Sequence, residues 1–195
     1  DPTRAFGFFT FIAATNVVSA MFVGIGLELP AAVLLAAAIA AWVVMGYSIP
    51  WLAVLSNPRR PILEAANGTW FIWVVASQSI AVVAAGIEPL YPEARQWLAI
   101  IAVTTWSMGV MLFAMCGLLL LFRLIMYRLE PQQLDPPYWI TMGAMAITVV
   151  AGARIVEMDD APMIDVTRAL IAGLSVIFWA FATWLIPALL AAGVW

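Results

Sequence analysis

Six apolar stretches follow one another along the chain, separated only by short polar segments. Each is close to the length of about 20 mostly apolar residues that a helix needs to cross the hydrocarbon core of a bilayer. No segment alternates apolar and polar residues as a half-buried strand does. The pattern therefore predicts an all-α integral membrane protein, with six transmembrane helices in a single domain over residues 1–195. The six stretches begin near Phe6, Pro30, Trp70, Trp97, Tyr138 and Val166.

The beginnings of the first, third and fifth predicted helices share a pattern. Each combines a capping or turn residue with Pro or Gly, followed by aromatic residues suited to a membrane interface. The segments are DPTRAFGFF, NGTWFIW and DPPYWI, and Asp1 and Asp135 lie two periods of about 67 residues apart. The repeat predicts three helical hairpins, over about residues 1–63, 64–130 and 131–195.

The composition removes several classes of function. Hydrophobic residues make up 66% of the chain and charged residues 10%; there is no His, and the single cysteine is Cys116. Haem, zinc and disulfide chemistry therefore lack the side chains they need, and we expect no cofactor and no metal site. Nucleic acid is not an expected partner, since no basic patch is present. The lipid bilayer is the expected environment.

Arginines are more frequent on one side of the predicted membrane. The side that carries the N-terminus holds Arg4, Arg59, Arg60, Arg123 and Arg128, and the opposite side holds Arg95, Arg154 and Arg168. The positive-inside rule then places the N-terminal end in the cytoplasm, and six crossings return the C-terminus to it. Because the chain starts at Asp1 without Met and stops at Trp195 beside a membrane helix, we interpret it as an internal segment of a longer protein.

Polar residues inside the predicted helices are the candidates for lining a pathway. Most lie in the first helix of each hairpin, and the side-chain amides occur only there. We therefore expect an inner ring of first helices surrounded by the second helices. The candidates are Thr15, Asn16 and Ser19, then Ser77, Gln78 and Ser79, and then Thr141, Thr148 and Gly152.

Each of these candidates also has a purely structural interpretation. Small and hydroxyl residues allow membrane helices to approach closely and to bond to one another, so packing is the first interpretation of the Ser and Thr positions. For Asn16 and Gln78, packing and pathway lining both stay open. Arg154 lies near the end of the fifth helix. Its guanidinium either reaches the interface along apolar surface or lies in a vestibule, where it concentrates anions.

The middle of every predicted span is free of charge. This argues against a proton-relay pump, which needs ionisable groups inside the membrane. A neutral pathway of hydroxyl and amide groups fits passive passage of small anions, stabilised by side-chain donors and helix ends. Composition alone leaves neutral solutes open as well.

The chain resembles the tellurite-resistance/dicarboxylate transporter family, along nearly its whole length. The segments that carry the resemblance are DPTRAFGFFTFIAATNV, NGTWFIWVVASQSIAVVAAG and LEPQQLDPPYWITMGAMAITVVAGA. This family includes bacterial tellurite-resistance proteins, fungal malate and sulfite transporters, and the plant slow-type anion channels. The resemblance implies a bacterial inner-membrane channel or transporter for small anions such as chloride, nitrate, sulfite or C4-dicarboxylates like malate.

The resemblance also implies an architecture. The family has ten helices in five hairpins around a quasi-fivefold pore, which the first helix of each hairpin lines. This chain resembles the third to eighth helices, so residues 4–27, 69–87 and 138–156 would face the pore. The gating phenylalanine of the family belongs to the ninth helix and has no counterpart here. Relatives are often trimers, so a homo-trimer is an expected partner arrangement.

Two other classes of function remain as alternatives. A membrane assembly subunit would pack against partner proteins without conducting, and flux separates it from a channel. An intramembrane enzyme would need an acid/base or metal constellation, and a chain without His, Lys or a mid-span carboxylate offers little for such chemistry. We therefore predict that the protein is not an enzyme.

Overall fold

The computed structural model describes residues 2–55, 62–127 and 136–194, and no strand occurs within these ranges. Six long helices dominate, and with their flanking turns all six are long and apolar enough to cross a membrane. The prediction of an all-α membrane protein with six spans is therefore confirmed. The helices are α1 (Phe9–Gly24), α2 (Glu28–Pro50), α3 (Phe71–Ile87), α4 (Arg95–Met126), α5 (Ile140–Val156) and α6 (Pro162–Val194).

The repeated sequence pattern corresponds to a repeated local structure. A short 3-10 turn precedes each of the odd-numbered helices: η1 (Pro2–Phe8), η4 (Gly68–Trp70) and η8 (Pro136–Trp139). In η4, the Asn67 side chain caps the turn by accepting a hydrogen bond from the Thr69 N–H over 2.9 Å. The other short turns are η2 (Trp51–Leu55), η3 (Ile62–Ala65), η5 (Glu88–Leu90) and η6 (Pro92–Ala94).

The helices form an inner row and an outer row. Each odd-numbered helix packs against the even-numbered helix that follows it, and α3 also packs against both α1 and α5. The apolar span of α3 is 72% buried, whereas those of α2, α4 and α6 are 22% buried or less. We call α1, α3 and α5 the inner row, with α3 at its centre, and the remaining helices the outer row. The spans of α1 and α5 are 28% and 33% buried, and the inner ring of first helices stays a prediction.

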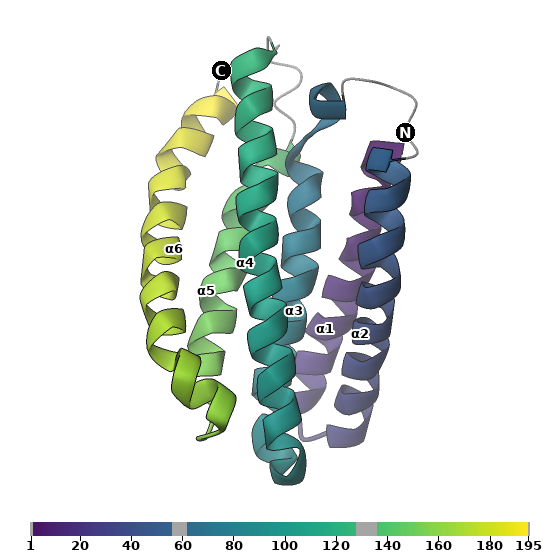
Figure 1. Cartoon of the computed structure of the whole chain (residues 1–195), viewed down its shortest axis with the longest axis vertical. Coiled ribbons are helices and arrows are strands. Elements are labelled where there is room, and N and C mark those ends of the chain that lie inside the picture. Colours follow the sequence, from purple (N-terminus) through teal and green to yellow (C-terminus); the bar gives the residue numbers. More distant parts are fainter. Residues whose placement is uncertain (1, 56–61, 128–135, 195) are drawn as a thin grey trace.

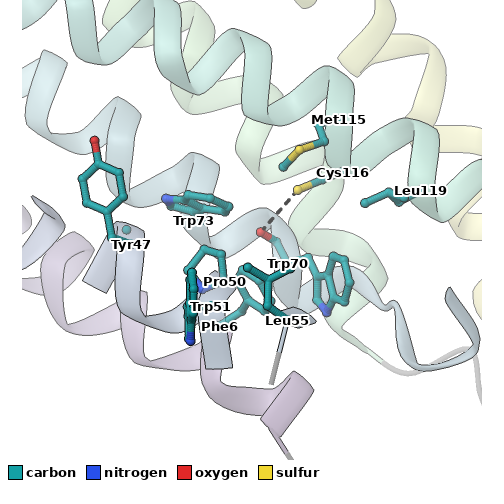
Figure 2. A pocket seen from close by; sticks show the side chains of 11 residues that line it. Phe6, Tyr47, Pro50, Trp51, Leu55, Trp70, Trp73, Met115, Cys116 and Leu119 are labelled. Atoms are coloured by element: carbon teal, nitrogen blue, oxygen red, sulfur yellow. Dashed lines mark hydrogen bonds between the residues drawn. The ribbon is translucent and has the colours of Figure 1, made fainter. Parts of the chain in front are cut away.

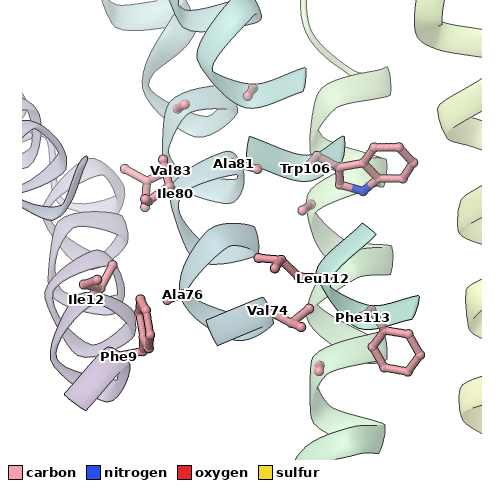
Figure 3. Packing of buried hydrophobic residues seen from close by; sticks show 14 of the residues in the cluster. Phe9, Ile12, Val74, Ala76, Ile80, Ala81, Val83, Trp106, Leu112 and Phe113 are labelled. Atoms are coloured by element: carbon pink, nitrogen blue, oxygen red, sulfur yellow. The ribbon is translucent and has the colours of Figure 1, made fainter. Parts of the chain in front are cut away.

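Both ends of the chain lie at the same end of the bundle (Figure 1). The inner-row helices all begin at this N-terminal end and finish at the opposite end, called the far end below. Buried apolar side chains join the helices along α3: Phe9 and Ile12 of α1 lie on one side of it, and Leu112 and Phe113 of α4 lie on the other (Figure 3).

Several predictions fall outside the described residues or differ in detail. Arg59, Arg60, Arg128 and the predicted hairpin boundary at 130/131 lie outside the described ranges, so the hairpin division stays a prediction. The second and sixth helices begin at Glu28 and Pro162, slightly before the positions expected from hydropathy. Proline is favoured in a first helical turn, where its missing N–H is not needed, so Pro30 and Pro162 fit within the helices.

Candidate functional site

Three of the predicted pathway residues meet at the middle of α3. Ser77, Gln78 and Ser79 are consecutive, and all three are buried. Because consecutive residues of a helix point about 100° apart, their side chains reach three different neighbours. Ser77 faces α2, Gln78 faces α4 and Ser79 faces α1.

The two serines accept hydrogen bonds from the helices beside α3. The indole Nε1–H of Trp42 on α2 donates to Ser77 Oγ over 2.8 Å, and the amide Nδ2–H of Asn16 on α1 donates to Ser79 Oγ over 2.9 Å. Each hydroxyl donates in turn to a carbonyl of α3 itself, over 3.0 and 2.8 Å. The Asn16 side chain is buried, and its Oδ1 has no partner among the described residues.

Gln78 connects α3 to α4 and, through it, to α5. Its Nε2–H donates to the carbonyl of Trp106 over 3.2 Å, and the Trp106 indole Nε1–H donates to the carbonyl of Thr148 over 3.0 Å. Gly109 makes this contact possible, since a Cβ there would overlap the Gln78 amide. The remaining Gln78 oxygen, Oε1, is buried and has no partner in the described part of the chain.

The other candidates of the first helix bond locally or to α2. The hydroxyl of Thr15, which is partly exposed, donates to the carbonyl of Phe11 over 2.8 Å. The buried Ser19 hydroxyl donates to the carbonyl of Ala31 on α2, also over 2.8 Å. Ser19 therefore ties the first two helices together near the far end.

The candidates of the fifth helix differ in what their side chains contact. The Thr148 hydroxyl donates to the carbonyl of Ala144 over 2.7 Å, and a Cβ at Gly152 would overlap Ser175 Oγ on α6. Thr141 Oγ1 is buried without a partner among the described residues. The structure thus brings Asn16 together with Ser79, and it connects Gln78 to the backbone of Thr148 through Trp106. A pathway-lining role for all nine residues remains a prediction.

Sequence reasoning missed the partners of these polar side chains. Trp42 and Trp106 supply two of the interhelical N–H donors, and Gly109 supplies the space for Gln78. Tryptophan in membrane proteins is enriched at the interfaces. A tryptophan at mid-span was therefore the signal that could have identified these donors.

Charged residues at the far end are largely bound to one another. Arg95 Nε lies 2.5 Å from Glu88 Oε1, and Arg95 Nη2 lies 2.7 Å from Asp159 Oδ2. Arg168 donates to the carbonyls of Val156 and Met158 at the end of α5, and it pairs with an Asp160 oxygen at 2.9 Å. Arg95 and Arg168 therefore hold the connections at the far end together. The residues that carry this network come from α4, α6 and the turns that follow α3 and α5.

Arg154 differs from these two arginines. Its Nη1 lies 3.6 Å from Glu157 Oε2, and the two side chains are 59% and 68% exposed. It borders a cavity of about 190 Å³ at the far end of the inner row. The cavity is also lined by Ala20, Val23 and Gly24 of α1 and by Val82, Val83 and Gly86 of α3. Residues from all three inner helices thus line this cavity, which we call the far mouth.

Two stripes of neutral residues lead away from this cavity. On α3, Ile72, Val75, Ser79, Val82 and Gly86 follow one another at spacings of three and four residues, and so share a helix face. On α5, Gly143, Ile147 and Val150 precede Arg154 at the same spacings, with partial or full exposure. Both stripes end at the cavity. Each stripe is one face of its own helix.

An inner row of three parallel helices, packed against an outer row of three more, defines the class as a multi-pass helical membrane protein. A family model described as "voltage-dependent anion channel", SLAC1, matches residues 3–194. The chain therefore belongs to this family of membrane anion channels and transporters.

Two proteins from strains of Mycobacterium tuberculosis are also similar, and each bears the name uncharacterized membrane protein. Each is 60% identical to this chain over 84 residues, which cover 43% of the chain and 43% of the relative. The matched segment thus spans less than half of these relatives. No solved structure matches the chain.

Proposed function

We propose that small anions cross the membrane along the face of the inner row that ends at Arg154. The observation that carries this proposal is the cavity at the far end, where Arg154 meets small residues of α1 and α3. Membership of an anion channel family supports the same conclusion. The proposal involves no enzymatic step.

Arg154 is the far-end arginine that can serve a passing anion. Arg95 and Arg168 are bound by carboxylates and carbonyls that hold the connections together. The pair that Arg154 forms with Glu157 is long and exposed, and such pairs contribute about 0–1 kcal/mol. An anion that reaches the cavity therefore displaces Glu157 at little cost.

The direction of the inner helices explains why a cation is needed there. α1, α3 and α5 all finish at the far end, and each helix C-terminus carries partial negative charge. Three such ends would repel an anion at this mouth. Arg154, in the last turn of α5, offsets that charge and raises the local concentration of anions.

The stripes on α3 and α5 suit conduction rather than tight binding. Their residues are neutral, so an anion that passes the mouth meets no fixed charge that would retain it. Ser79 is the polar residue of the α3 stripe, and its buried hydroxyl is paired with Asn16 of α1.

One guanidinium suits monovalent anions such as chloride and nitrate, or sulfite. C4-dicarboxylates such as malate are further candidates, because the family resemblance includes their transporters. We place the protein in the bacterial inner membrane, with the N-terminal end of the bundle in the cytoplasm. This orientation follows from the arginine distribution. The far mouth with Arg154 would then face the periplasm.

The test is anion flux in liposomes, with chloride, nitrate, sulfite and malate compared under an imposed potential. Arg154→Gln should lower chloride flux about tenfold, because charge focusing changes encounter rates by such factors. Arg154→Lys keeps the charge and should retain most of the flux. Glu157→Gln removes the competing carboxylate and should raise flux at low anion concentration.

Two results would oppose the proposal in different ways. Equal flux in the wild type, Arg154→Gln and a charge-reversed Arg154→Glu would place the pathway elsewhere. The absence of anion flux through a folded, correctly inserted wild-type protein would instead favour the non-conducting assembly subunit. Circular dichroism and gel filtration of each variant identify the folded samples.

A further inference from the structure

We infer that a groove on the outer surface, between α2 and α4, binds an acyl chain of a membrane phospholipid. The groove has a volume of about 370 Å³ and lies toward the N-terminal end of the bundle. The last turns of α2 and the turn η2 form one wall, and the C-terminal half of α4 forms the other. Phe6, Trp70 and Cys116 are buried beneath it. The site is separate from the proposed anion pathway and does not depend on it.

The local sequence of α2 creates this groove. Gly46 lines the groove without a side chain, and a Cβ there would lie 3.8 Å from Trp73 Nε1. Trp73 of α3 and Cys116 of α4 line the same groove (Figure 2). Pro50 cannot donate a backbone hydrogen bond to the carbonyl of Gly46, four residues earlier. The chain then continues as the wider π-type turn η2. A glycine, a proline and a wide turn together leave a hollow where a regular helix would pack.

The rim of the groove belongs to the surface that meets lipid. Tyr47 is 80% exposed, Trp51 62% and Met115 44%. In a bundle with six membrane spans, such side chains on the outer row lie against hydrocarbon. The lining is almost entirely apolar, and water needs two to four polar partners to occupy a cavity. An acyl chain matches this lining, because it fills the hollow with apolar contacts.

The aromatic lining suits the ester region of a phospholipid rather than bare hydrocarbon. Trp70 and Trp73 both line the groove, and the Nε1–H of each lacks an acceptor among the described residues. An indole N–H is a donor only, and an ester carbonyl is an acceptor only, so the two are complementary. The open space beside Gly46 allows a small turn of the partly exposed Trp73 ring toward such a carbonyl.

A bound lipid would support an aromatic cluster that joins α1 to α3. The Phe6 ring lies 5.0 Å from that of Trp70 and 5.9 Å from that of Trp73, measured between ring centroids. Phe9 also stacks on Trp73, with centroids 5.6 Å apart. The acyl chain covers the open side of this cluster. Lipid binding should therefore raise the thermal stability of the protein.

The experiment fills the groove and counts the lipid that stays bound. Gly46→Leu places a side chain in the hollow, and Gly173→Leu is the matched control on α6, where the added carbon meets open space. Each protein is washed free of loosely held lipid in mild detergent, and retained phospholipid is measured by native mass spectrometry. Melting temperature is recorded with and without added dioleoyl phosphatidylglycerol.

We expect the wild type and Gly173→Leu to retain phospholipid and to gain thermal stability when it is added. Gly46→Leu should retain at least twofold less and gain little. If Gly46→Leu does not fold, Gly46→Ala replaces it, because its Cβ would lie at an ordinary 3.8 Å from Trp73 Nε1. Trp73→Phe should remove any preference of the protein for ester-linked over ether-linked lipid.

Two outcomes would overturn the inference. Equal lipid retention by folded Gly46→Leu and the wild type would show that lipid binds elsewhere. A wild-type protein that retains no lipid but forms dimers, which Gly46→Leu abolishes, would assign the groove to a second copy of the chain. Neither outcome depends on anion flux, so the proposed function is tested separately.

Discussion

Substituting Gly109 by Ala tests whether Gln78 lies against α4, as the structure places it. The added Cβ would overlap the Gln78 Nε2 and lie only 2.8 Å from Cδ and 3.2 Å from Cγ of the same side chain. Either α3 and α4 move apart, or the amide turns away and loses its hydrogen bond to the carbonyl of Trp106. Both responses weaken the contact between these helices.

The expected cost follows from two contributions. Overpacking a well-packed site costs about 1–3 kcal/mol. An interhelical hydrogen bond in a membrane contributes about 0.6 kcal/mol on average and about 1.7 at most. We expect Gly109→Ala to lower the free energy of unfolding by about 2–3 kcal/mol, since the two losses partly replace one another. With Gln78→Ala the methyl has room, so the double variant should recover about 1–2 kcal/mol relative to the sum of the single variants.

Reversible unfolding in mixed micelles of detergent and SDS measures these free energies. Gly117→Ala is the control on the same helix, because its nearest neighbour outside the helix backbone is Phe113 Cε1 at an ordinary 4.0 Å. It should change stability by no more than about 0.5 kcal/mol. A neutral Gly109→Ala, or losses that simply add in the double variant, would refute the placement of Gln78 against Gly109.

Two further predictions concern the N-terminal end of the bundle. Gly68→Ala should lower the free energy of unfolding by about 3 kcal/mol or more and reduce the folded yield, because the added Cβ would overlap the backbone of Pro137, which cannot rotate away. Gly143→Ala, which has open space around it, is the control and should be tolerated in the same melting assay. Tyr138→Phe removes the hydroxyl that accepts a hydrogen bond from the buried Arg123 over 2.7 Å. It should lower the free energy of unfolding by about 1.5–3 kcal/mol. An unchanged free energy of unfolding would show that this bond is not formed.

The six spans could be predicted because the length of an apolar run directly determines whether a helix crosses a bilayer. Helix starts were less accurate, since hydropathy does not report capping. The last helix begins at Pro162, ahead of the apolar run at Val166, because proline suits a first turn and Asp165 is favourable beside the positive end of the helix dipole.

Side-chain directions could not be predicted in the same way. The helices are apolar on all sides, so no polar stripe distinguishes an inner face from an outer one. Gln78 and Ser79 are neighbours in sequence, but they face α4 and α1 respectively. Only the positions of the partners decide such directions. The partners Trp106 and Asn16 lie 28 and 63 residues away in the chain.

The position of the polar residues follows from the cost of polar groups in lipid. An unpaired polar group in hydrocarbon is unfavourable, so amides and hydroxyls are tolerated where protein neighbours can bond to them. α3 has neighbours in both rows, and it carries the triplet from Ser77 to Ser79. Polar residues in this bundle are therefore found where several helices surround a position. A conducting wall is better sought among small neutral residues such as Gly86 and Gly143, which have open space beside them and lie on the faces that lead to Arg154.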